Sequence, residues 1–134
     1  MLKNYRIMIS HSWDYNEQYE KVKSWLSEQP YFKWSDYSAP LSNSIDAVSK
    51  RDLEERLENR IACCSCVIIL SGMYVVNSKW INFEIGTAVE HGKPVIGVKP
   101  WGNERTPAKV WETADVVVGW NRASVVDAVR EYAL

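Results

Sequence analysis

The chain has 134 residues, a formal net charge of −1, and 46% apolar and 25% charged residues, which fits one ordinary globular domain spanning residues 1–134. Because charges of both signs are spread along it and no basic face is evident, we expect no nucleic-acid partner. It contains no apolar stretch of about 18 residues that would cross a membrane, and its N-terminus lacks a signal-peptide pattern, so we expect a cytoplasmic protein without a membrane partner.

The first half of the chain alternates β-rich runs with amphipathic segments. Apolar residues at helical spacing, such as Leu53, Leu57 and Ile61, indicate helices. A segment rich in Ser, Asp and Asn indicates a long loop, and such loops are often functional. We expect a strand at 5–10, a helix at 16–28, a strand at 31–34, a loop at 35–49 and a helix at 50–63.

The second half continues the alternation with continuous apolar runs, which are typical of strands covered on both faces. Asn77 or Ser78 is a suitable cap for a helix that runs to about His91, with Gly92 as its stop. We expect strands at 66–70, 95–98 and 115–118, a short helix at 108–113 and a last helix at 124–132.

This order of elements predicts an α/β fold of the flavodoxin-like, three-layer type. We expect a five-stranded parallel sheet in the order 2-1-3-4-5 with helices on both faces. Ligands of such sheets bind beyond the carboxyl ends of the strands, near the switch point beside the first strand. The expected site therefore consists of residues 10–13, the loop 35–49, residues 71–77 and the start of the helix that follows.

The three cysteines, Cys63, Cys64 and Cys66, lie within IACCSCVIIL and far in sequence from both histidines. A metal site would need a further ligand at suitable spacing. We therefore expect small apolar residues where a helix meets a buried strand, and no metal ion.

Common motifs of this architecture are missing. The segment SHSWDY after the first strand has no glycine, so the dinucleotide fingerprint GxGxxG is absent, as is a GxxxxGK phosphate loop. A phospho-receiver domain would need acidic residues where Ser10 and Ser71 stand.

The helix that contains Glu84 carries the most informative spacing. Its first turns lie beside the expected crevice, where a helix N-terminus would favour an ionised Glu84 unless burial opposes it. Spacing alone favours a solvated charge for Glu84 and a core-edge aromatic for Trp80. One face, suited to packing on the sheet, contains Ile81, Ile85, Ala88 and Val89, and the neighbouring face contains Trp80, Glu84, Thr87 and His91.

The layout resembles the TIR domain family. YRIMISHSWDY is similar to the family's first strand and loop, SKWINFEI to its Ser-x-Trp-x-x-x-Glu helix, and GKPVIGV to the strand that follows. Over residues 5–98 the resemblance is closest to the short bacterial TIR-like proteins of Thoeris antiphage defence. The chain departs from plant and animal TIR domains in its first loop, where His11-Ser12-Trp13 precedes Asp14, and in the loop 35–49.

The resemblance implies an NAD⁺-consuming enzyme that cleaves the nicotinamide–ribose bond, with Glu84 as its catalytic residue and Trp80 at the family's tryptophan. It implies NAD⁺ as substrate, no cofactor, and a product, cyclic or otherwise modified ADP-ribose, that reaches a separate effector. Self-association through TIR–TIR contacts is also implied.

Other residues are candidates for substrate binding by their location. His11 is either a ligand residue or a loop histidine bonded to backbone, and His91 is structural. Aromatic residues 31, 32, 34 and 37 either stack on adenine or belong to the core or an interface. The expected substrate-binding residues are Ser10, His11, Ser12, Asp36, Ser38 and Trp80.

Two alternatives to the enzyme remain open. One is a scaffold module that assembles through TIR–TIR contacts without turnover, in which some of the seven tryptophans would form interfaces. The other is a flavodoxin-like nucleotide sensor, which would bind tightly without releasing nicotinamide. Glu84 favours the enzyme, because TIR adaptors often lack an acid at this position.

Overall fold

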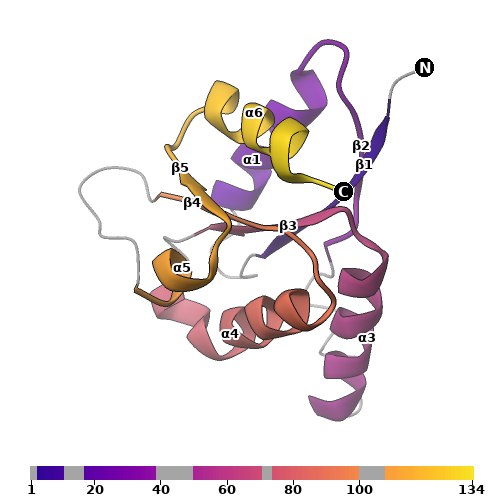
Figure 1. The fold of residues 1–134 in the computed structure, drawn as a ribbon, viewed down its shortest axis with the longest axis vertical. Helices are drawn as coiled ribbons and strands as arrows, with labels where there is room; N and C mark the ends of the chain where they lie inside the picture. The colour runs from indigo at the N-terminus through magenta and orange to yellow at the C-terminus, as the bar shows by residue number, and fades with distance from the viewer. Residues whose placement is uncertain (1–2, 11–16, 39–49, 71–73, 100–107) are drawn as a thin grey trace.

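A computed structural model of the chain describes residues 3–10, 17–38, 50–70, 74–99 and 108–134. Strands and helices alternate along these segments and form three layers, with the sheet in the middle (Figure 1). The strands are β1 (Asn4–Ser10), β2 (Lys33–Asp36), β3 (Cys66–Leu70), β4 (Val95–Val98) and β5 (Val116–Val118).

The sheet is parallel and its strand order is β2-β1-β3-β4-β5, which confirms the predicted topology. β1 lies between β2 and β3, with Ile7 opposite Asp36 on one side and Ser10 opposite Ile69 on the other. All residues of β3 and β4 are buried, because helices cover both faces of the sheet.

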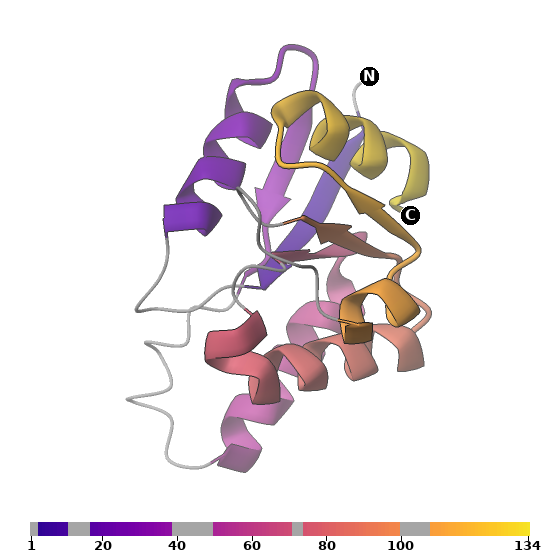
Figure 2. The same cartoon turned by 90° about the vertical axis from the view of Figure 1, so that its left-hand side faces the viewer.

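The helices form the two outer layers. α1 and α6 pack together over one face, and α3, α4 and α5 cover the other (Figures 1 and 2). None of the helices in the described segments has both the length and the apolar character needed to span a bilayer. Their bounds are α1 (Glu17–Glu28), α3 (Lys50–Cys63), α4 (Tyr74–Glu90), α5 (Ala108–Thr113) and α6 (Arg122–Tyr132).

The second strand begins two residues later than predicted, at Lys33 rather than Tyr31. Tyr31 has a positive φ of 56°, a conformation outside the β region, and its side chain is 85% exposed. Phe32 is 8% exposed and its ring stacks on that of Tyr5, so it belongs to the hydrophobic core. The shift places Asp36 at the end of β2, and its assignment to the long loop is wrong.

The helix α4 begins at Tyr74, earlier than the predicted caps Asn77 and Ser78. In a helix interior Asn and Ser each cost only about 0.5 kcal/mol relative to Ala, so the apolar residues before them can extend the helix. Glu84 therefore lies in the middle of α4 rather than in its first turns. Gly92, with a φ of 66°, follows the helix and confirms the predicted stop.

Candidate active site

Glu84 is a buried carboxyl group at the interface between α4 and the sheet. Its exposed fraction is 3%, so the expectation of a solvated, partly exposed position is wrong. The buried surface of α4 includes both predicted faces, since Ile85 is fully buried and Thr87 is 5% exposed. Val89, predicted to face the sheet, is instead 54% exposed, because it lies at the edge of this wider buried surface.

Burial raises the pKa of Glu84 to about 7, and the nearby Ser10 hydroxyl opposes this rise. The helix N-terminus does not supply the expected stabilisation of the charge, because that effect falls off within the first turn and Glu84 lies beyond it. At neutral pH the protonated and ionised forms of Glu84 are therefore both present.

Ser10 is the last residue of β1 and only 1% exposed. Its hydroxyl is close enough to lower the pKa of Glu84. Even so, no hydrogen bond of normal geometry joins them, and within the described segments Ser10 Oγ and Glu84 Oε2 both have no hydrogen-bond partner. Buried polar atoms without partners are rare and costly, and a functional site is one of the recognised reasons for them. The structure thus brings together two of the sequence-predicted site residues at the carboxyl edge of the sheet.

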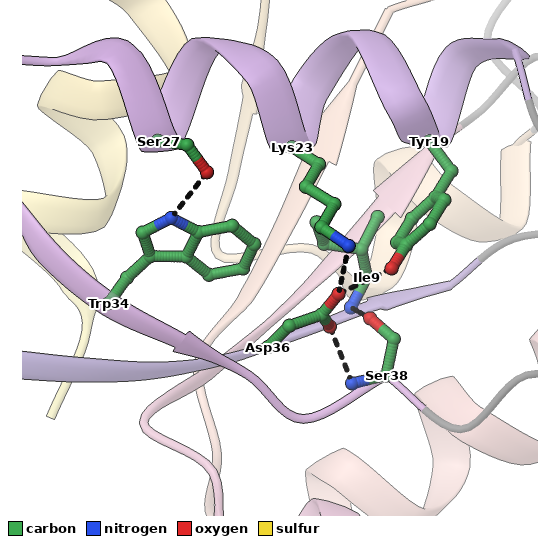
Figure 3. A network of polar contacts seen from close by, with 7 residues as sticks. All are labelled: Ile9, Tyr19, Lys23, Ser27, Trp34, Asp36 and Ser38. Carbon is green, nitrogen blue, oxygen red and sulfur yellow. Dashed lines mark hydrogen bonds and ion pairs between the residues drawn. The ribbon is translucent and has the colours of Figure 1, made fainter.

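Asp36 and Ser38, two other predicted contacts, take part in a polar network (Figure 3). Asp36 accepts hydrogen bonds from the Tyr19 hydroxyl and from the Ser38 amide, the latter at 2.8 Å. Lys23 Nζ lies 3.8 Å from the Asp36 carboxylate. Ser38 Oγ in turn accepts a hydrogen bond of 2.8 Å from the Ile9 amide. Contact of either residue with a substrate stays a prediction.

The remaining predicted site residues lie partly outside the described part of the chain. His11 and Ser12 fall between β1 and α1, outside the described residues. The backbone of Trp80 belongs to α4, one turn before Glu84, while its side chain lies outside the described part of the structure.

Several aromatic residues lie where they cannot meet a ligand at the carboxyl edge. Tyr31 and Phe32 precede β2 and are therefore at its amino end. Trp34 donates a hydrogen bond of 3.2 Å from Nε1 to Ser27 of α1 (Figure 3). His91, the residue after α4, has its Nε2 3.2 Å from Glu58 of α3, a contact that fits the predicted structural role.

A family model described as "Thoeris protein ThsB, TIR-like domain" matches residues 8–105, which include both Ser10 and Glu84. The chain belongs to this ThsB TIR-like family. The match confirms the resemblance read from the sequence. No curated protein matches the chain.

Two solved structures share the fold of this ThsB-like chain. The Clostridium botulinum CMP N-glycosidase BcmB is similar with a TM-score of 0.57 and 17% identity, over 93% of this chain and 98% of its own. A de novo designed Rossmann 2x3 fold protein is similar with a TM-score of 0.51 and 17% identity, over 96% and 87%. At this identity the similarities support the open α/β architecture alone.

Sequence reasoning missed two features of this ThsB-like chain. Tyr19 and Lys23 were assigned only to a helix, and no local pattern signals their contact with Asp36, because it depends on the packing of α1 against β2. A hollow of about 430 Å³ lies beside the start of α1 and Trp120, two residues after the end of β5. Trp120 lines this hollow and packs edge-on against Trp25, with their ring centroids 4.9 Å apart.

The cysteines of the ThsB-like chain lie at the junction of α3 and β3, as predicted. Cys64 and Cys66 are fully buried, and Cys63 is exposed. Burial raises the pKa of the Cys64 thiol to about 11, so it is protonated at neutral pH. In the described segments no three His, Cys, Asp or Glu side chains are grouped so that they could hold a metal ion.

Proposed function

We propose that this ThsB-like chain cleaves the bond between nicotinamide and ribose in NAD⁺, with Glu84 as its catalytic residue. One observation carries the proposal: the Glu84 carboxyl is buried beside Ser10 at the carboxyl edge of the sheet, where ligands of open α/β folds bind. A buried ionisable group with a perturbed pKa in such a place is typical of an active site.

The chemistry requires only one carboxylate. When the bond from ribose C1′ to the nicotinamide nitrogen breaks, its electron pair neutralises the positive ring, and nicotinamide departs without an acid. The ribose becomes oxocarbenium-like, as in glycoside hydrolysis, and an anionic Glu84 stabilises that charge. Attack by water then gives ADP-ribose, whereas attack by a hydroxyl of the same molecule gives a cyclic product.

The substrate itself favours the form of Glu84 that this chemistry needs. In the free protein the pKa of Glu84 is about 7, so part of the population is protonated. A cationic nicotinamide ring bound nearby stabilises the carboxylate and lowers this pKa, because opposite charges favour ionisation. Substrate binding and ionisation of Glu84 are then linked.

The family context supplies the rest of the proposal. The product, in its cyclic form, is a diffusible signal for a separate effector in antiphage defence, and self-association through TIR–TIR contacts accompanies activity. The alternative is an assembly module without turnover, for which the buried acid would have no chemical use.

A second candidate is hydrolysis of a nucleotide whose base leaves as an anion unless it is protonated. The observation that favours it is the raised pKa of Glu84, which keeps a proton available near neutral pH. In that reaction Glu84 would act as a general acid, so the two candidates need opposite protonation states of the same residue.

The test is to incubate the purified protein with NAD⁺ and, separately, with CMP, in buffer and in lysate from phage-infected cells. The products are separated by chromatography and identified from their masses by mass spectrometry. Nicotinamide together with linear or cyclic ADP-ribose supports the first candidate, and free cytosine supports the second. A folded protein that releases neither base under either condition supports the assembly module.

A further inference from the structure

We propose that Ser38 and Asp36 are positioning residues that hold the end of β1, and with it Ser10, in place against Glu84. The proposal rests on the proposed function for the catalytic role of Glu84. It differs from the sequence-based expectation, in which both residues touch the substrate.

The end of β1 is held differently on its two sides. Toward β3 the strand pairing continues to the last residue, with Ser10 opposite Ile69. Toward β2 the pairing ends at Asp36, opposite Ile7, followed by a hydrogen bond of 2.8 Å from the Tyr37 amide to the Ile7 carbonyl. Beyond Ile7, the next backbone amide of β1 on this side donates its hydrogen bond to a side chain.

That side chain is Ser38. Its Oγ accepts the hydrogen bond of the Ile9 amide at 2.8 Å, immediately before Ser10, and the residue is only 9% exposed. In a buried environment such a bond is expensive to lose, because water does not replace the missing acceptor. The Ser38 hydroxyl therefore fixes the backbone from which Ser10 projects.

Asp36 in turn fixes Ser38. One carboxylate oxygen accepts a hydrogen bond of 2.8 Å from the Ser38 amide, in a local turn that is typical of Asp. The other oxygen faces Tyr19 and Lys23 of α1 (Figure 3). Burial is the main cause that raises the pKa of the Tyr19 hydroxyl above its ordinary value, and the hydrogen bond to Asp36 adds to the rise. The hydroxyl therefore stays protonated and donates to Asp36. The network thereby ties α1 and β2 to the end of β1.

If the network positions Ser10, it also influences the pKa of Glu84, which a purely structural network would leave unchanged. Burial raises the pKa of Glu84, and within the described residues the one group that lowers it is Ser10. If the network positions Ser10, loosening the network weakens this influence, and Glu84 then titrates at higher pH. A substitution that only destabilises the fold leaves the titration of the remaining folded protein unchanged.

The experiment titrates the Glu84 side-chain carboxyl by ¹³C NMR in the unliganded full chain, for wild type, Ser38→Ala and Ser38→Thr. Ser35→Ala is the matched control, since the Ser35 hydroxyl also bonds across β1 and β2 but to Asn4 at the opposite end. We expect the midpoint to rise by about 0.3–0.5 pH unit in Ser38→Ala, to return toward wild type in Ser38→Thr, and to be unchanged in Ser35→Ala. An unchanged midpoint in folded Ser38→Ala overturns the proposal.

Tyr19→Phe provides a second variant should Ser38→Ala fail to fold, because it removes one donor to Asp36 and keeps the ring. A smaller rise in the same direction supports the proposal, and a wild-type midpoint overturns it. NMR titration needs no turnover, so it decides this point even if NAD⁺ is not the substrate. With NAD⁺ cleavage established, we expect Ser38→Ala to lower kcat about tenfold with less than about a twofold change in KM, the pattern of a misplaced catalytic group.

Discussion

The Ser10 hydroxyl and the Glu84 carboxyl meet in a buried place at the carboxyl edge of the sheet, and neither Ser10 Oγ nor Glu84 Oε2 has a hydrogen-bond partner within the described residues. β1 supplies one group and the middle of α4 the other. Two unpaired oxygens in a dry setting are costly for the free protein, and under the proposed function we expect a substrate hydroxyl to satisfy both.

The pH dependence of the reaction follows from the ionisation of Glu84. Because its carboxylate form is the reactive one with NAD⁺, kcat/KM should rise with pH and level off above about 7, the pKa of the free protein. The midpoint of kcat should lie lower, since the bound cationic ring favours ionisation. Initial rates between pH 5 and 9 check both curves. If kcat/KM falls as pH rises through 7, Glu84 acts as an acid and the NAD⁺ mechanism is wrong.

Glu84→Gln should stabilise the folded protein at neutral and alkaline pH. Burial raises the pKa from 4.5 to about 7, so an ionised Glu84 costs the folded state on the order of 3 kcal/mol, at about 1.4 kcal/mol per pH unit. Below about pH 4.5 both states hold the proton and this cost vanishes. Between the two values the wild type loses stability as pH rises.

Thermal unfolding of both proteins at pH 4 and pH 8 measures this difference. We expect the variant to melt several degrees above wild type at pH 8 and close to it at pH 4. Equal melting temperatures at pH 8 would contradict the burial of Glu84 in the folded state.

Ser10→Ala should raise the pKa of Glu84, because the Ser10 hydroxyl is the group that lowers it. The midpoint of the kcat/KM profile then moves to higher pH, and the rate at pH 6.5 falls more than the rate at pH 9. Ser35→Ala, which removes a hydroxyl bonded to Asn4 at the start of β1, should leave the profile unchanged. A uniform loss of rate at every pH in Ser10→Ala would instead indicate a contact with the substrate alone.

Two glycine substitutions should change stability in opposite directions. A Cβ on Gly97 of β4 would lie 2.8 Å from Val110 Cγ1, so Gly97→Ala should cost about 1–3 kcal/mol through overpacking of α5 on the sheet. A Cβ on Gly86, exposed in α4, meets no atom within 4 Å. Gly86→Ala should therefore stabilise the protein by about 0.5–1 kcal/mol. Urea unfolding of the two variants checks the pair, and equal effects would contradict the packing of α5.

The two fully buried strands, β3 and β4, were predictable to the residue. The bounds of β3 and β4 match the prediction because each is an uninterrupted apolar run closed by polar or glycine residues. β2 was misplaced because the aromatic residues Tyr31 and Phe32 look like strand residues, while the positive φ of Tyr31 starts the strand later. No sequence pattern reports that backbone angle.

The proximity of Ser10 and Glu84 was predictable from the sequence, and their burial was less so. Strand ends and helix order place Ser10 and Glu84 at one edge of the sheet. The burial of Glu84 depends on how closely α4 packs against α3 and the sheet, which is a property of the assembled layers. The bond from Tyr19 to Asp36 likewise exists only once α1 is packed against β2.

The most direct test of the account is nicotinamide release from NAD⁺ by wild type, Glu84→Gln and Glu90→Gln, under whichever condition activates the wild type. Glu90 is an exposed glutamate at the end of the same helix, so its variant controls for the loss of one acid from α4. We predict that Glu84→Gln loses at least about 100-fold in kcat, the size expected for a preorganised charge, and that Glu90→Gln keeps the wild-type rate. Wild-type turnover by folded Glu84→Gln would contradict the central claim.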